Sequence, residues 1–241
     1  MAEDIKMNQF GIATSLDYVY GEIANGSQKK MAMHIMDTLS EGVFIMFHRN
    51  SDNYPLMVKP DKWASYQSSG EIAEGVVVVE GGKILVVAPT EADSAGLLWS
   101  SAAVSGGGKT TTDRLVAFDD WSGKANTAAQ ITHAECSGAA YAPGFCAQYS
   151  RVNANGKGLT AGRWWLPSEG ELMMIYANMR KINYCLSLIE GATQLAEMWY
   201  WSSTEYSATL AWGLSLDGAR ANHGTKAEHK RRVRPVSAFI V

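Results

Sequence analysis

The sequence has few charged residues and no marked excess of either sign. Charged side chains make up 19% of the 241 residues, and the formal net charge is −3. Proteins that bind nucleic acid or an anionic membrane surface through a basic field carry an excess of Lys and Arg. The densest basic run is Lys230–Arg232 with Arg234, and so short a run is typical of a solvated or salt-bridged strand. We therefore expect no nucleic-acid partner.

Long apolar runs are also missing. The longest, Gly75–Val79, has the length of a strand and not of a membrane span. The first residues, Met1–Lys6, have neither the basic region nor the apolar region of an export signal. From the sequence we expect no membrane insertion and no export signal in this chain.

Cysteine is scarce and odd in number. The three residues, Cys136, Cys146 and Cys185, contain no CxxC spacing. Cys136 and Cys146 are able to pair across a loop, or all three are free thiols, as is usual for a chain made in a reducing compartment. Both alternatives stay open at this point.

Recognisable catalytic motifs are absent. No HExxH or GxSxG pattern occurs, and His223 and His229 have no Cys or carboxylate at metal-site spacing. Ala103–Thr110 approximates a phosphate-binding loop, but Ala stands at its first position, and the following Arg114–Phe118 is typical of a strand and not of the required helix. A plain flexible glycine loop is the alternative. We expect no enzyme, no cofactor and no metal site.

Residues 1–68 are predicted to form a small β-rich N-terminal appendage. Residues 16–20 and 29–33 read as strands around Asn25–Gly26, a strong hairpin signal. A short helix is predicted over 35–39 and a strand over 42–47. The region is too small for a core of its own, which suggests a docking or oligomerisation segment.

Residues 69–241 are predicted to form one α+β domain. Two β-branched runs, 75–79 and 84–87, flank Gly81–Gly82 and predict a hairpin. A long stretch of weak periodicity follows, to about residue 162. Ser168 and Glu171 form a capping box that starts a helix with an apolar face, and a second short helix is predicted over 184–189.

The C-terminal part is predicted to consist of strands. Leu210, Trp212, Leu214 and Leu216 alternate with Ala211, Gly213, Ser215 and Asp217. This period of two predicts that the large apolar residues are buried and that Gly213, Ser215 and Asp217 face outward. Asp217–Gly218 supplies a turn, and Val233–Phe239 reads as a closing strand near a sheet edge, where proline is tolerated.

Three segments in order carry a family resemblance: Arg163–Leu172 (RWWLPSEGEL), Tyr200–Glu205 (YWSSTE) and Arg232–Phe239 (RVRPVSAF). They resemble C-type-lectin-like domains of the formylglycine-generating-enzyme type. More closely, they resemble the variable proteins of diversity-generating retroelements found in gut bacteria and their phages. The resemblance covers about residues 70–241, and it implies a C-type-lectin-like fold. Residues 1–68 resemble phage tail or fibre modules.

The resemblance also implies a binding face whose residues are diversified by mutation of adenines in Asn codons, here within about residues 205–232. Such codons do not yield Trp, Gln, Glu or Lys, so Glu205, Trp212, Lys226, Glu228 and Lys230 are expected to be fixed or to come from other codons. The candidate ligand-binding residues, all reachable by that mutation, are Leu210, Gly213, Ser215, Asp217, Arg220, Asn222, His223, Gly224, His229 and Arg231.

The function implied is recognition of a bacterial surface receptor, protein or glycan, by a phage receptor-binding protein in the virion tail fibre. A homo-oligomer such as a trimer is expected. One alternative is an adhesin or lectin on a bacterial cell surface. Another is an oxidase like the formylglycine-generating enzymes, which use paired cysteines close to a C-terminal active site. This sequence departs from that pattern, because its cysteines all precede Trp199.

Overall fold

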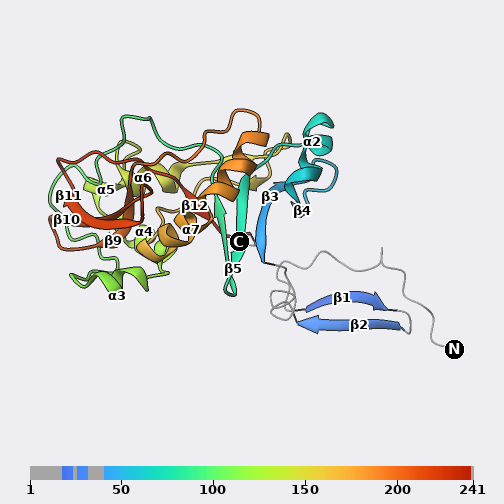
Figure 1. Ribbon diagram of the computed structural model, residues 1–241, viewed down its shortest axis with the longest axis horizontal. Coiled ribbons are helices and arrows are strands. Elements are labelled where there is room, and N and C mark those ends of the chain that lie inside the picture. Colours follow the sequence, from blue (N-terminus) through green and yellow to red (C-terminus); the bar gives the residue numbers. More distant parts are fainter. Residues whose placement is uncertain (1–17, 24–25, 32–40, 240–241) are drawn as a thin grey trace. The chain divides into compact units, whose positions relative to one another are not determined.

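The computed structural model describes residues 18–23, 26–31 and 41–239 (Figure 1). The chain divides into two units, Met1–Ser40 and Glu41–Val241. In the first unit, β1 (Tyr18–Ile23) and β2 (Gly26–Met31) pair antiparallel, with Tyr18 opposite Met31. The hairpin predicted around Asn25–Gly26 is therefore confirmed. The short helix predicted over 35–39 lies outside the described residues.

The second unit begins at residue 41, and the predicted boundary at residue 68 is wrong. β3 (Gly42–His48) is an inner strand of a five-stranded antiparallel sheet with the order β12-β6-β5-β3-β4. β4 (Pro55–Val58) pairs with it on one side, and β5 (Gly75–Glu80) on the other. α2 (Pro60–Ser68) buries Trp63 in the same core. Residues 41–68 thus complete the domain, because their apolar strand needs partners on both edges.

The β5–β6 hairpin is confirmed. β6 (Lys83–Val87) pairs with β5, and Glu80 lies opposite Lys83 across a two-residue loop. Gly81 and Gly82 occupy this loop with φ of +56° and +72°. Both values are left-handed, as in the two-residue turn whose twist matches that of a hairpin.

The main core lies between this sheet and α7 (Glu169–Leu188). The capping box predicted for α7 is confirmed, because the Glu171 carboxylate accepts from the backbone N–H of Ser168 at 2.9 Å. The separate helix predicted over 184–189 is wrong, since α7 continues through those residues. Ile182 and Cys185 are buried at helical spacing, so packing favours continuation of the helix.

The segment between β6 and α7 is more structured than its weak periodicity suggests. It contains α3 (Arg114–Phe118), α4 (Gly123–Gln130), α5 (Ala134–Ser137) and α6 (Ala142–Gln148), followed by β7 (Arg151–Val152) and β8 (Gly158–Leu159). The strand predicted over 114–118 is wrong. The Asp113 carboxylate accepts from the N–H groups of Leu115 at 2.8 Å and Val116 at 3.3 Å, and this N-cap starts a helix instead.

A three-stranded antiparallel sheet with the order β11-β10-β9 lies between two cores. β9 spans Trp199–Glu205, β10 Leu210–Ser215 and β11 Arg220–Thr225. Tyr200 and Leu214 enter the main core, whereas Trp201 and Ala211 enter a second core that includes Trp99 and Cys146. β12 (Val236–Ser237) closes the chain as an edge strand beside β6, as predicted. The described fold is therefore α+β with antiparallel sheets.

Candidate ligand-binding face

β10 is buried on both faces, which corrects part of the predicted alternation. Trp212, Leu214 and Leu216 are buried as expected. However, Gly213 is buried too, and Ser215 is 2% exposed, so the prediction that they face outward is wrong. The cause is the position of β10 between β9 and β11, with side chains from the neighbouring segments covering the face that was expected to be open.

The Arg231 side chain covers much of that face. Its guanidinium carbon lies 4.7 Å from the ring centroid of Trp199 and 4.5 Å from that of Trp201. Nη1 donates to the carbonyl of Asn222 at 3.1 Å. Burial lowers the pKa of Arg231 to about 10, which leaves the guanidinium charged at neutral pH. Cation–π contact with two indole rings holds this side chain flat against the sheet.

Two glycines make room for the guanidinium. A Cβ at Gly213 would lie 2.3 Å from Nη1 of Arg231, and a Cβ at Gly224 would lie 2.8 Å from Nη2. Both residues are buried. Gly213, Gly224 and Arg231, which the sequence placed among the ligand-contacting residues, therefore form a support under the face, because any larger side chain at either glycine would displace the guanidinium.

A buried ion pair anchors the other end of the sheet. Glu205 and Lys226 are both fully buried, and Lys226 Nζ donates to the Glu205 carboxylate. The N–H groups of Gly106 and Gly108 also donate to this carboxylate, at 2.9 and 3.1 Å. The glycine loop that resembled a phosphate-binding loop thus holds an anion of its own chain. Within the described residues 88–113, no strand leads into this loop and no helix directly follows it, so the phosphate-site geometry is not present.

The remaining candidate residues do not share one face. Asp217, Arg220, Asn222 and His229 are exposed, and Asp217 pairs with Arg220 at 2.9 Å. The β10–β11 register places Leu210 and His223 on the opposite face of the sheet, where the His223 ring lies 4.1 Å from that of Tyr206. The accessible part of the predicted set is therefore β11 together with its two flanking turns.

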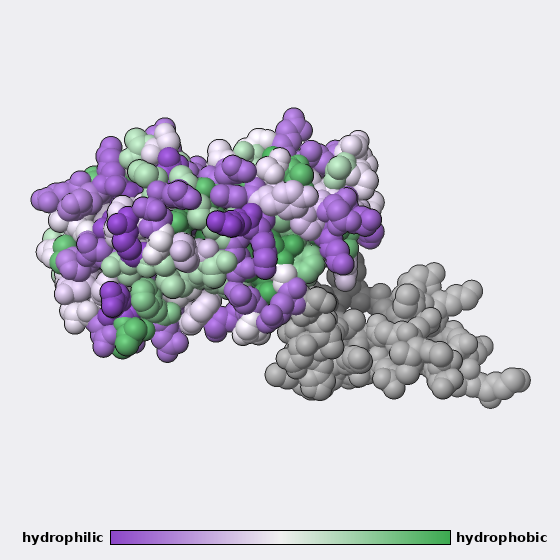
Figure 2. All heavy atoms as spheres, in the orientation of Figure 1, coloured by the Kyte–Doolittle hydropathy of each residue, from purple (hydrophilic) through white to green (hydrophobic). Residues whose placement is uncertain are grey.

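A hollow of about 580 Å³ borders this accessible part. It is lined by Arg114, Leu115, Phe118, Trp199, Ala219, Arg220, Ala221 and Asn222. Leu115 is 72% exposed and Val116 is 41% exposed, and hydrophobic surface is visible where α3 lies (Figure 2). The predicted ligand-binding set contains neither the α3 residues, since 114–118 was expected to form a strand, nor Trp199. Asp113 in the N-cap position was the available signal.

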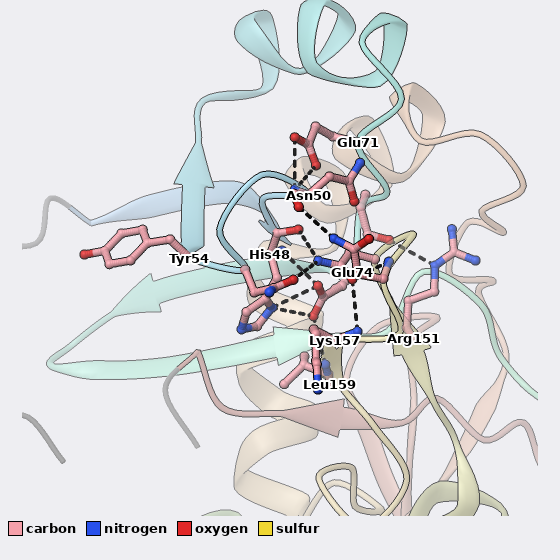
Figure 3. A network of polar contacts seen from close by, with 12 residues as sticks. His48, Asn50, Tyr54, Glu71, Glu74, Arg151, Lys157 and Leu159 are labelled. Carbon is pink, nitrogen blue, oxygen red and sulfur yellow. Dashed lines mark hydrogen bonds and ion pairs between the residues drawn. The ribbon is translucent and has the colours of Figure 1, made fainter. Parts of the chain in front are cut away.

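A second polar cluster, around Glu74, forms hydrogen bonds that connect neighbouring strands (Figure 3). The buried Glu74 carboxylate accepts from the backbone N–H of His48 at 2.8 Å and from that of Leu159 at 2.9 Å, and His48 Nδ1 lies 2.9 Å from both of its oxygens. Arg151 Nε donates to the carbonyl of Ala73 at 3.0 Å. The cluster joins β3 and the segment before β5 to β7 and β8, which is a structural role.

The cysteines are not placed for nucleophilic or redox chemistry. All three are buried and unpaired, so the disulfide between Cys136 and Cys146 that the sequence left open does not form. Burial raises the pKa of Cys136 to about 12, that of Cys185 to about 11 and that of Cys146 well above its usual value. Thiols in such surroundings are inert, because the thiolate is the reactive form.

Within residues 41–239 and the described hairpin, no group of three or more His, Cys, Asp or Glu side chains is arranged to hold a metal ion. No helix of the described residues is long and apolar enough to cross a membrane.

Comparison with protein-family models, with curated proteins and with solved structures finds no match to this chain.

Proposed function

We propose that this protein is a receptor-binding protein with a C-type-lectin-like fold, and that β11, its flanking turns and the adjoining hollow form its ligand face. Its partner is a receptor on a bacterial surface, and the protein is displayed on a virion or on a cell. The resemblance of the segments Arg163–Leu172, Tyr200–Glu205 and Arg232–Phe239 to variable proteins motivates the fold and the partner. A homo-oligomer, assembled through the N-terminal unit, is part of the same proposal, since several weak faces give avidity.

One observation carries the proposal: exposed polar side chains stand on a support that is fixed from below. Asp217, Arg220 and Asn222 are exposed, whereas the neighbouring strand β10 is buried and the Arg231 guanidinium is held by two indole rings. Side chains on so rigid a base change identity without disturbing the core, and they lose little entropy when a ligand binds.

The test measures binding of the fluorescently labelled full chain to a panel of bacterial cells by flow cytometry. Arg220→Ala and Asn222→Ala are expected to lower cell binding at least about tenfold, which corresponds to about 1.4 kcal/mol. Lys62→Ala is the control, because Lys62 is an exposed cation on α2, and α2 and β11 lie at opposite ends of the second unit (Figure 1). Protease treatment of the cells removes protein receptors, and periodate treatment removes glycan receptors.

Two results would refute the proposal. One is the absence of saturable binding to every strain in a panel that includes gut bacteria. The other is equal loss of binding in Lys62→Ala and Arg220→Ala, which would place recognition elsewhere. The oligomeric state is read separately, by light scattering of the full chain, and a monomer at micromolar concentration would remove the avidity argument alone.

A further inference from the structure

β11 presents the open edge of its sheet. In the order β11-β10-β9, the far edge of β9 is already covered, because Trp201 N donates to the carbonyl of Arg232 at 3.0 Å and Arg232 N donates to that of Trp199 at 2.9 Å. No further strand of the described residues pairs with β11. An open edge offers unpaired N–H and C=O groups to an incoming strand.

The hydrogen-bond ladder shows which groups point outward. Lys226 N donates to the carbonyl of Thr209 at 3.0 Å, which continues the register that pairs Thr225 with Leu210. Bonded and non-bonded pairs alternate in an antiparallel ladder. The N–H and C=O groups of Ala221, His223 and Thr225 therefore point away from β10.

Two of these three outward amides are already occupied by side chains. His223 N donates to Oδ1 of Asn222 at 2.9 Å, and Thr225 N donates to Nδ1 of His229 at 3.0 Å. Ala221 has no such side-chain partner within the part of the chain that the structure describes. The outer edge of β11 is thus closed to an incoming strand at His223 and Thr225 and open at Ala221.

The open position borders the hollow. Ala221 lines it, with Leu115 and Phe118 of α3 and Trp199 providing apolar surface. Arg114, on its rim, forms no ion pair or side-chain hydrogen bond with a described residue. Among the described residues, Arg220 forms an ion pair with the exposed Asp217 alone, and surface pairs of this kind exchange partners at little cost.

We propose that the hollow takes a short extended segment of a partner polypeptide, which pairs with the backbone of Ala221 as a fourth strand. The inference rests on the proposed function and names the chemistry of the ligand. A polypeptide in extended conformation offers N–H and C=O groups at strand spacing to Ala221. Its apolar side chain covers Leu115 beside Trp199, and a carboxylate on the segment binds the Arg114 guanidinium. Asn222 and His229 limit the added strand to the end of β11.

The experiment selects 12-residue peptides from a random phage-displayed library on the immobilised full chain and measures their affinity by fluorescence anisotropy. Ala221→Pro removes the open amide, and proline is tolerated at an edge position whose N–H is outside the ladder. Leu115→Ala removes apolar surface of the hollow without changing the backbone. Tyr184→Ala, an exposed aromatic on α7, is the control. Circular dichroism checks that each variant folds.

The expected result is at least tenfold weaker peptide binding in Ala221→Pro and Leu115→Ala, and unchanged binding in Tyr184→Ala. N-methylation of the peptide is expected to weaken binding at one position, because a strand that pairs with Ala221 alone directs a single N–H group to its carbonyl. Failure to select any peptide, or tolerance of methylation at every position, overturns the inference. If these variants leave peptide binding unchanged while Arg220→Ala still abolishes cell binding, the proposed function stands and the strand pairing does not.

Discussion

The buried pair of Glu205 and Lys226 yields the sharpest stability prediction. Glu205 receives three donors, namely Lys226 Nζ and the N–H groups of Gly106 and Gly108. Lys226 in turn donates to the carbonyl of Val104 at 2.7 Å and lies 4.2 Å from the ring centroid of Trp99. Glu205→Gln keeps the shape of the side chain but removes the negative charge, so it leaves a buried ammonium without its counter-ion.

The magnitude follows from the complete burial of both side chains. Removal of one partner from a buried pair costs about 3–5 kcal/mol, because the remaining charge stays desolvated. Burial already lowers the pKa of Lys226, so this lysine is expected to release its proton in the variant and to hold the cost toward the lower end of that range. We therefore expect Glu205→Gln to lower the free energy of unfolding by about 3 kcal/mol.

The assay is urea denaturation followed by tryptophan fluorescence, which reports on Trp99 beside the pair. Glu228→Gln is the matched control, since Glu228 is exposed, and it is expected to change stability by less than about 0.5 kcal/mol. The double variant Glu205→Gln/Lys226→Met removes both charges and is expected to recover part of the loss. A loss below about 1 kcal/mol in Glu205→Gln would show that the carboxylate is not the anchor of the glycine loop.

Two further predictions concern buried ionisable groups. Burial raises the pKa of Glu169 from 4.5 to about 8 and that of Glu171 to about 7. Both side chains therefore hold protons in the folded state that the unfolded chain releases. Their contribution to the free energy of unfolding is full below pH 4.5 and is lost as the pH rises to about 8. Urea denaturation at pH 5 and pH 8 measures this slope, and a Glu169→Gln variant with the same slope as the parent would contradict it. The buried cysteines are expected to resist a thiol-specific disulfide reagent at pH 8 in the native protein and to react, all three, in 6 M guanidinium; rapid labelling of the folded chain would show that a thiol is accessible.

Local signals predicted the elements whose cause is local. The β5–β6 hairpin depends on β-branched runs around two glycines, and the start of α7 depends on a capping box within four residues. The end of α7 was misjudged, because no glycine or proline marks a break near Tyr184 and the buried spacing simply continues. The Asp113 N-cap is a local signal of the same kind, but the threonines before it favour a strand and led to the wrong prediction for 114–118.

Contacts between distant segments explain the larger misses. Glu205 holds Gly106 and Gly108 across 99 and 97 residues, so no window of sequence shows why that loop is ordered. The position of β3 inside the main sheet is equally hard to predict from a window of sequence, because its partners β4 and β5 are separated from each other by α2. A segment of 68 residues looked independent because the strands that complete it come later in the chain.

The alternating pattern of β10 was predicted correctly, yet part of the ligand-binding set derived from it was wrong. Alternation in Leu210–Asp217 correctly marked one face of β10 as core, but it contains no information about what covers the other face. A long side chain from residue 231 crosses that face and needs glycine at 213 and 224. The exposed side chains therefore lie on the neighbouring strand β11 and not on β10. If the face is diversified, substitutions at Asp217 and Arg220 are expected to leave folding intact. Substitutions at Gly213, Gly224 and Arg231 act on the support itself, and Asn222 stands between the two groups because its side chain also closes the edge of the sheet.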